Sequence, residues 1–240
     1  MEIIKVKTID DLNSTVATWI TEHINETLQK QDRYTIALSG GNTPKSLHRL
    51  LASDAYRNKI DWSKLHIFWG DERHVPFEDE RNNAKMAYDT LLNFVDVPAS
   101  QIHVMRTDIP AEESAAEYEK ILRAYFTDAP TTFDLVLLGI GDDAHTLSLF
   151  PGKREVIHEQ EKWATSLWLE SQNMYRVTLT APVVNKSARV AFVLAGGSKA
   201  PAIKHVLQGE YNPDLYPSQV IKPSPGELFW FLEEAAGALV

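Results

Sequence analysis

The residues best suited to chemistry follow an apolar run near the middle of the chain. Residues 135–138 are Leu-Val-Leu-Leu, residues 139–141 are Gly-Ile-Gly, and two aspartates and His145 come soon after them. Buried parallel strands are typically continuous apolar runs, and ligands in open α/β sheets collect beyond the carboxyl ends of such strands. A histidine placed there, two residues after Asp143, can be oriented by the carboxylate and can exchange a proton near neutral pH. The pattern therefore predicts an active-site loop within residues 134–152, with His145 and Asp143 in catalytic roles.

Other interpretations of this loop stay open. The glycines suit a plain strand-to-helix turn, and one of the two aspartates, Asp142 or Asp143, suits the cap of a following helix. A lone histidine is more often structural than catalytic, although the preceding aspartates favour a functional role for His145. One histidine and two aspartates lack the pattern of a metal-ligand set, and no His-Glu-x-x-His motif accompanies them, so the sequence predicts no metal site.

A second glycine-rich loop, residues 39–44, joins a predicted strand to a predicted helix that Pro44 opens. Glycine lets a backbone approach a ligand closely, and free N–H groups at the start of a helix attract anions. The loop is neither a Walker A loop nor a Gly-x-Gly-x-x-Gly fingerprint, so it does not indicate a nucleotide. A tight turn with Thr43 as the helix N-cap is the alternative. The candidate anion-binding residues of this loop are Ser39, Gly40, Gly41, Asn42 and Thr43.

Polar side chains next to other predicted strands extend this candidate site. Arg73 follows a strand at residues 65–69 and can clamp a phosphate or stabilise a developing oxyanion. The alternative for Arg73 is a surface ion pair with Asp71 or Glu72, which would contribute little to the stability of the fold. Arg176 stands inside a predicted strand, which is unusual unless its side chain faces a ligand or a partner. The further candidate substrate ligands are Asn83, Gly141, Arg176 and Lys199.

The composition limits the classes of function. The 240 residues are 44% hydrophobic and 24% charged, which is ordinary for a globular protein. A formal net charge of −9 argues against nucleic-acid binding, which needs a basic surface. The absence of cysteine excludes disulfides, a cysteine nucleophile and thiolate metal sites. Because the N-terminus lacks a signal-peptide pattern and no apolar run is long enough to span a bilayer, we expect a cytoplasmic protein that binds no membrane.

Strand-like and helix-like segments alternate along the chain, which favours a mainly parallel sheet with helices on both faces. We expect a single domain over residues 1–240, with the prolines at 213–225 in an ordered surface excursion. The predicted strands are 3–6, 34–38, 65–69, 102–105, 135–138, 163–168, 175–179 and 190–194. The predicted helices are one capped by Asp10 or Asp11, one from Pro44 to Leu51, the segments 84–92, 111–126 and 200–207, and an Ala-rich C-terminal helix.

Six segments, in order along the chain, resemble the 6-phosphogluconolactonase family, which shares its fold with glucosamine-6-phosphate deaminases. The segments, at residues 38–47, 68–76, 138–152, 176–180, 194–200 and 226–236, read LSGGNTPKSL, FWGDERHVP, LGIGDDAHTLSLFPG, RVTLT, LAGGSKA and GELFWFLEEAA. The combination of DERHVP with HTLSLFPG is specific, because related deaminases are expected to carry a different acidic motif and an Asn-Glu-Pro-Gly ending in place of residues 149–152.

The resemblance implies a Rossmann-like fold of the sugar-phosphate isomerase/CoA transferase type, with a small C-terminal α/β extension. It implies hydrolysis of 6-phospho-D-glucono-1,5-lactone to 6-phospho-D-gluconate, the second step of the oxidative pentose phosphate pathway, without a metal or a cofactor. The expected partner is a phosphorylated sugar lactone, and the expected assembly is a monomer or a weak homodimer.

The resemblance also implies roles for the candidate residues. His145, held by Asp143, is then the general base, and Arg73 assists glycine-loop amides at the oxyanion. The glycine-rich loop at residues 39–43 holds the phosphate, with charge supplied by Arg176 or Lys199.

Two residues depart from the family pattern. Ala144 stands where the family has glycine between Asp and His, and Asn42 stands where it has serine. Alanine disfavours a positive φ, so a loop that needs that conformation would have to shift and its activity could change. The difference is one methyl group, and we expect the enzymatic function to be retained.

Two other functions remain as alternatives. One is a sugar-phosphate isomerase/deaminase, which would release ammonia from glucosamine 6-phosphate. The other is a non-catalytic sugar-phosphate-binding module, which a ligand would stabilise without turnover. The chain has no helix–turn–helix extension or basic arm, which argues against a regulator that binds DNA.

Overall fold

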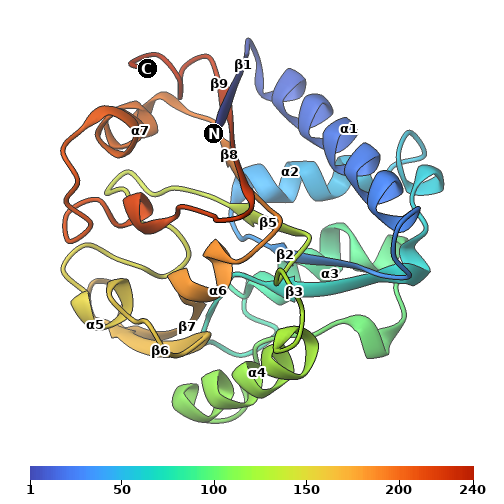
Figure 1. Cartoon of the computed structure of the whole chain (residues 1–240), viewed down its shortest axis with the longest axis horizontal. Coiled ribbons are helices and arrows are strands. Elements are labelled where there is room, and N and C mark those ends of the chain that lie inside the picture. Colours follow the sequence, from blue (N-terminus) through green and yellow to red (C-terminus); the bar gives the residue numbers. More distant parts are fainter.

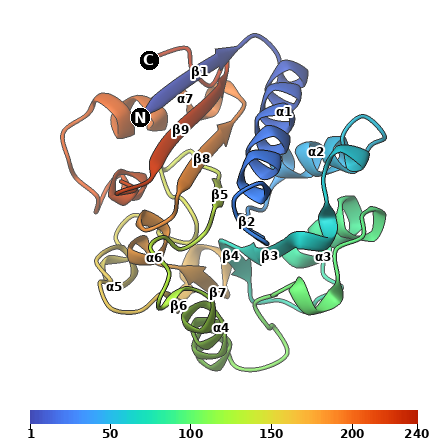
Figure 2. The ribbon, with the colours of Figure 1, turned by 45° about the vertical axis from the view of Figure 1, so that its right-hand side comes forward.

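Six parallel strands form the central sheet of the protein, with helices on both of its faces (Figure 1, Figure 2). The computed structural model describes residues 1–240, and the strand order is β1-β9-β8-β5-β2-β3, which confirms the predicted parallel α/β fold. The strands are β1 (Glu2–Val6), β2 (Tyr34–Leu38), β3 (Leu65–Trp69), β5 (Leu135–Leu138), β8 (Arg189–Leu194) and β9 (Glu227–Glu233). The helices are α1 (Ile9–Leu28), α2 (Asn42–Leu51), α3 (Asn83–Thr90), α4 (Ala111–Phe126), α5 (Arg154–Ile157), α6 (Ala181–Asn185) and α7 (Ala200–Gln208).

Alternate side chains of the central strands enter two hydrophobic cores, one on each face of the sheet. In β5, Val136 and Leu138 pack in the core that contains α4, α6 and α7. Leu135 and Leu137 pack in the core that contains α1, α2 and α3. A strand that is buried on both faces reads as a continuous apolar run, which explains why β2, β3 and β5 have the bounds predicted from the sequence.

A separate antiparallel sheet of three strands, in the order β4-β7-β6, adjoins the end of β3. Gly70 connects the two sheets, because its N–H donates to Leu38 at 2.9 Å and its carbonyl accepts from the N–H of Leu179 at 2.8 Å. The register places Arg73 opposite Arg176. The strands are β4 (Asp71–Arg73), β6 (Ala164–Leu169) and β7 (Met174–Leu179). The sequence predicted β6 and β7 as strands, but it did not indicate that they pair with β4 in a sheet of their own.

The predicted strand at 102–105 is wrong. A single bridge joins Ile102 to Ile67 at the edge of the central sheet, and no ladder follows it. Ile102 and Val104 are instead partly buried against the core on the α1–α3 side. Their apolar character reflects this packing, which a local pattern cannot distinguish from strand formation.

The predicted C-terminal helix is also wrong. Residues 234–239 form turns, and the Glu233 carboxylate accepts the N–H of Ala235 at 3.0 Å in place of a helical hydrogen bond. Strand β9 lies between β1 and β8, so the C-terminal residues complete the central sheet.

The predicted cap of helix α1 is wrong, because the helix begins two to three residues earlier than Asp10 or Asp11 would place it. Thr8 is the N-cap, and its side chain accepts from the N–H of Asp11 at 3.0 Å. Asp11 returns the contact to the backbone of Thr8, which makes a capping box. None of the helices is both long enough and apolar enough to cross a membrane.

Three histidines in the fold are expected to make the protein less stable in mild acid. Burial lowers the pKa of His23 to about 3 and the pKa values of His48 and His103 to about 4. Unfolded histidines bind protons near pH 6.5, so unfolding takes up protons below that pH and its free energy falls as the pH falls toward 4. For His48, which is fully buried, the loss reaches about 3 kcal/mol at pH 4.

Urea unfolding of the protein and of His48→Gln, near neutrality and at about pH 5, measures this effect. Glu72 acts in the opposite direction, because burial raises its pKa to about 7 and its protonation stabilises the fold as the pH falls. Both chains retain Glu72, so the difference between them isolates His48. The same pH dependence in both chains would contradict the prediction.

Candidate active site

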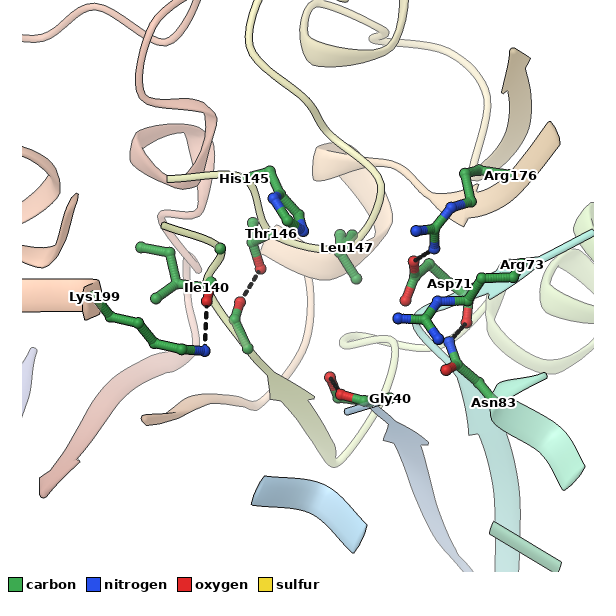
Figure 3. Close-up of a pocket in the computed structure, with 13 residues that line it drawn as sticks. Gly40, Asp71, Arg73, Asn83, Ile140, His145, Thr146, Leu147, Arg176 and Lys199 are labelled. Carbon is green, nitrogen blue, oxygen red and sulfur yellow. Dashed lines mark hydrogen bonds and ion pairs between the residues drawn. The ribbon is translucent and has the colours of Figure 1, made fainter. Parts of the chain in front are cut away.

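A cavity of about 230 Å³ opens beyond the carboxyl ends of β2, β5 and β8, next to the small antiparallel sheet (Figure 3). Parallel α/β sheets commonly bind ligands at this edge. Three cationic side chains and one carboxylate line the cavity, so it is locally positive in a chain whose net charge is −9. The lining residues are Ser39, Gly40, Asp71, Arg73, Asn83, Gly139, Ile140, Gly141, His145, Thr146, Leu147, Arg176 and Lys199.

Most of the candidate residues from the sequence meet at this cavity. Eight of them line it: Ser39, Gly40, Arg73, Asn83, Gly141, His145, Arg176 and Lys199. Asp143 lies behind His145 and contacts its ring. Three candidates of the first glycine-rich loop, namely Gly41, Asn42 and Thr43, do not line the cavity.

The start of α2 explains why only part of that loop reaches the cavity. The helix begins at Asn42, and its N-cap is Gly41 rather than Thr43. Gly41 has a φ of 106°, a left-handed conformation that favours glycine. Gly40 has to be glycine for a different reason, because a Cβ there would lie 2.0 Å from Oδ1 of Asn83. Ser39 and Gly40 therefore form the floor of the cavity beside Asn83.

Five lining residues were not among the candidates, namely Asp71, Gly139, Ile140, Thr146 and Leu147. Four of them belong to the loop after β5, where the sequence had already indicated an active site. Asp71 had been considered only as an ion-pair partner of Arg73. Its position, with only Gly70 between it and the β3 run, was the available signal, and its partners come from distant parts of the chain.

His145 and Asp143 form a close pair at the rim of the cavity. Nδ1 of His145 lies 2.5 Å from Oδ1 of Asp143, and the backbone N–H of His145 donates to the same oxygen at 3.1 Å. Burial raises the pKa of Asp143, but the hydrogen bonds from His145 outweigh it and hold the pKa below its ordinary value. Because an ionised carboxylate only accepts hydrogen bonds, the proton of the neutral ring lies on Nδ1 and is donated to Asp143. Nε2 is then the free, basic nitrogen.

The turn that carries His145 is fixed by backbone hydrogen bonds. The N–H of Gly141 donates to the carbonyl of His145 at 2.8 Å, and the N–H of Ala144 donates to the carbonyl of Gly141 at 2.9 Å. Thr146 Oγ1 donates to the carbonyl of Gly139 at 2.8 Å. No helix follows directly, so neither aspartate caps one and the glycines do not form a strand-to-helix turn.

Ala144 adopts the left-handed conformation, with a φ of 65°, and its side chain is fully buried. This conformation costs an alanine roughly 1–2 kcal/mol. The turn therefore accommodates alanine through backbone strain rather than through a shift of the loop. Gly141 is irreplaceable on steric grounds, because a Cβ there would lie 2.1 Å from Nδ1 of His145 and 2.6 Å from Oδ1 of Asp143.

The small sheet supplies one wall of the cavity. Asp71 accepts from Ser148 Oγ at 2.7 Å and from Nη1 of Arg176 at 3.3 Å. Arg73 makes no ion pair with Asp71 or Glu72, and its Nη1 donates to the carbonyl of Arg81 at 2.8 Å. The surface ion pair considered from the sequence is therefore not formed, and Arg73 remains at the cavity.

Glu72, fully buried behind this wall, organises the backbone around it. Its carboxylate accepts the N–H of Arg73 at 2.8 Å, of Asn83 at 2.7 Å and of Ala84 at 2.8 Å. Burial raises the pKa of Glu72 to about 7 against these three donors. Asn82 caps α3, which leaves the side chain of Asn83 to donate to the carbonyl of Asp71 at 2.9 Å beside the cavity.

Arg176 is only 4% exposed. Its Nη2 donates to Oε1 of Gln172 at 2.7 Å, and its buried Nε has no partner in the chain. Burial lowers the pKa of Arg176, and the carboxylate of Asp71 opposes that shift. A buried guanidinium with an unpaired N–H is suited to an anionic ligand.

Lys199 stands on the opposite side of His145 from the two arginines (Figure 3). It follows Gly196-Gly197-Ser198 after β8, and its Nζ donates to the carbonyl of Ile140 at 2.7 Å. Burial lowers the pKa of Lys199, and Asp142 opposes that shift. The cavity thus presents cations on two sides of one histidine.

The arrangement can bind an anion and exchange a proton next to it. Gly40, Gly139 and Ile140 line the cavity, and their N–H groups carry no hydrogen bond within the chain. The chain holds no group of three or more His, Asp or Glu side chains arranged to bind a metal ion. Fold and cavity together define an α/β protein with a histidine–carboxylate pair in a cationic site.

Comparison with known proteins identifies the family. Residues 7–230 match the family model described as glucosamine-6-phosphate isomerases/6-phosphogluconolactonase, and the chain belongs to this family. It is 42% identical over 223 residues to a 6-phosphogluconolactonase of Nostoc sp., a match that covers 91% of this chain and 90% of that protein.

Solved structures agree with this assignment. The crystal structure of the 6-phosphogluconolactonase of Thermotoga maritima superposes with a TM-score of 0.84 and 25% identity, covering 97% of this chain and 99% of that one. A monomeric glucosamine-6-phosphate deaminase superposes with a TM-score of 0.85 and full coverage of both chains, but its 18% identity shows a shared fold alone.

Proposed function

We propose that this protein is a 6-phosphogluconolactonase, which hydrolyses 6-phospho-D-glucono-1,5-lactone to 6-phospho-D-gluconate in the oxidative pentose phosphate pathway. The observation that carries the proposal is the pair of His145 and Asp143 at the rim of a cavity with cations on two sides. The relatives named 6-phosphogluconolactonase support it, because they match over nearly the whole chain at up to 42% identity.

The first step is attack of water on the lactone carbonyl. Nε2 of His145 takes a proton from water as the oxygen bonds to C1. The oxyanion that develops at C1 is stabilised by Arg73 and by free amide groups of the glycine-containing loops, such as that of Gly40. Gly141 does not supply such a donor, because its N–H is already bonded to the carbonyl of His145.

The second step opens the ring. The protonated His145 delivers its proton to the ring oxygen as the bond from C1 to that oxygen breaks. Asp143 stabilises the imidazolium between the two steps and holds the ring in one orientation. The products are a carboxylic acid and a hydroxyl group on one open chain. The acid then releases its proton, the second one from water, to the solvent and leaves as a carboxylate, and these steps use no metal or cofactor.

The phosphate is held by Ser39, the other residue of the loop at 39–43 that lines the cavity, together with Arg176 or Lys199; Gly41, Asn42 and Thr43 lie outside the cavity. Lys199 fits this role because its Nζ spends one hydrogen bond on Ile140 and keeps two protons for a ligand. Arg176 already contacts Asp71 and Gln172, so a phosphate there would have to share it.

Replacing Lys199 with alanine is expected to raise KM for the phosphorylated lactone about 10- to 100-fold, with a much smaller change in kcat, because a charged hydrogen bond to the phosphate is lost. Steady-state kinetics with 6-phosphogluconolactone and with unphosphorylated gluconolactone measure the effect. Lys204, an exposed lysine of α7, provides the control variant Lys204→Ala. An unchanged KM in Lys199→Ala would assign the phosphate to Arg176.

The activity itself is tested with lactone made in situ from glucose 6-phosphate, after subtraction of spontaneous hydrolysis. Loss of lactone that depends on the protein supports the proposal. Release of ammonia from glucosamine 6-phosphate would instead identify the protein as a deaminase. Stabilisation by 6-phosphogluconate without turnover would identify it as a non-catalytic binding module. The cytoplasmic location and the monomeric or weakly dimeric state stay predictions.

A further inference from the structure

A proline-rich segment far along the chain contacts the backbone next to His145. Ser218 lies in the short helical turn Pro217–Val220, and it is 1% exposed. Its N–H donates to the carbonyl of Ala144 at 3.1 Å, and its Oγ donates to the same carbonyl at 2.7 Å. One residue thus fixes the peptide group that leads into His145.

The same segment holds the other end of the active-site loop. The carbonyl of Asp214 accepts the N–H of Gly152 at 3.0 Å. The carboxylate of Asp214 contacts Nε2 of His158 at 2.6 Å and the guanidinium of Arg154. Residues 144–152 are therefore bracketed by contacts to residues 214 and 218, although the two stretches are more than sixty residues apart.

Gln219 ties this segment to its neighbours through three side-chain hydrogen bonds. Its side chain is 5% exposed, and its Oε1 accepts the N–H of Asn212 at 2.7 Å. Its Nε2 donates to the carbonyls of His205 at 3.1 Å and Glu210 at 3.0 Å, which ties the segment to the end of α7. Buried amides that are fully hydrogen-bonded specify a single local structure.

The conformation of Ala144 gives such a support a role beside the hydrogen bonds within the turn. A left-handed alanine is strained, so the turn would relax toward other conformations if nothing held it. Two hydrogen bonds to the carbonyl of Ala144 oppose that relaxation and fix the direction in which His145 leaves the turn. We propose that Ser218 is a positioning residue for His145 and compensates for alanine in the turn, an inference that rests on the proposed lactonase function.

Ser218→Ala removes only the Oγ hydrogen bond, and it is expected to lower kcat about tenfold while KM changes less than about twofold. Ser187 provides the matched control. It is also fully buried, and its Oγ lies 3.0 Å from Thr132 Oγ1 and 3.5 Å from the carbonyl of Val183, outside the cavity. Ser187→Ala is expected to leave kcat within about twofold, whatever it does to the melting temperature.

The Ala144→Gly background separates positioning from general support of the fold. Glycine adopts the left-handed conformation without strain, so the loss of the Oγ hydrogen bond should then lower kcat less than about threefold. A tenfold loss in both backgrounds, or an equal loss in Ser187→Ala, would overturn the proposal.

Amide hydrogen exchange tests the same inference without activity. Faster exchange in Ser218→Ala, confined to residues 141–149, is expected, with the strands of the central sheet unchanged. If the parent protein does not hydrolyse the lactone, the proposed function fails. The same exchange pattern would still show that Ser218 stabilises the turn. Unchanged exchange in residues 141–149 would overturn that role even in an active enzyme.

Discussion

His145→Ala is expected to lower kcat for 6-phosphogluconolactone about a hundred- to ten-thousand-fold, with little change in the affinity for the product. His145 is the only histidine at the cavity. Its Nδ1 is bound to the carboxylate of Asp143, which leaves its Nε2 free. Its removal takes away both the acceptor for the proton of water and the donor to the ring oxygen. The cations and the glycine-containing loops remain, so the anion is still bound.

Two measurements check this result. The rate with freshly made lactone, corrected for spontaneous hydrolysis, gives kcat, and calorimetric titration with 6-phosphogluconate gives the affinity. Asp143→Asn should also lower kcat strongly, because an amide no longer favours the tautomer with its proton on Nδ1. If binding and turnover weaken equally in His145→Ala, the general-base role is excluded.

Gly141→Ala is expected to lower kcat at least about a hundredfold while the protein stays folded, because the histidine and the carboxylate can no longer occupy their present positions. The added Cβ would lie 2.1 Å from Nδ1 of His145 and 2.6 Å from Oδ1 of Asp143, far inside contact distance. The side chains lie at the rim and can move, so the change should act on catalysis more than on the free energy of unfolding.

Gly139→Ala is the matched control for this variant. It lies two residues earlier in the same loop and also lines the cavity, but its added Cβ would have Ser39 Oγ, at 3.8 Å, as the nearest atom. Its kcat should stay within about threefold of the parent. Circular dichroism and melting curves of both variants establish folding. Near-normal turnover in Gly141→Ala would mean that catalysis does not need the observed arrangement of His145 and Asp143.

Local sequence patterns were sufficient to predict the bounds of elements whose burial produces a regular pattern of apolar residues. Strands β2, β3 and β5 and helix α4 have the predicted bounds, because continuous apolar runs and a clear helical period specify them. The loop after β5 could be found for the same reason, since its glycines and charged residues end such a run abruptly. The candidates that follow β2, β5 and β8 then met at one cavity because these strands are parallel and their carboxyl ends share an edge.

What could not be predicted depends on contacts between distant residues. The partners of Asp71 are Ser148 and Arg176, which lie 77 and 105 residues away along the chain. Ser218 contacts Ala144 across 74 residues, and no local feature distinguishes it from other serines near prolines. The Ala-rich C-terminus illustrates the opposite error, because helix propensity there is overridden by the hydrogen bonds of Glu233.

Gly70 is the single residue between β3 and β4, so the two sheets that build the site meet at this point. The parallel sheet carries His145 and Asp143 on the loop after β5 and Lys199 after β8, whereas the small antiparallel sheet carries Arg73 and Arg176. The proposed catalytic pair and the two arginines therefore lie on two frameworks that meet at one short junction. Substitutions in the hairpin formed by β6 and β7 can change how Arg176 meets an anion while His145 keeps its own scaffold. This architecture therefore offers a route by which one chemistry can be adapted to new substrates.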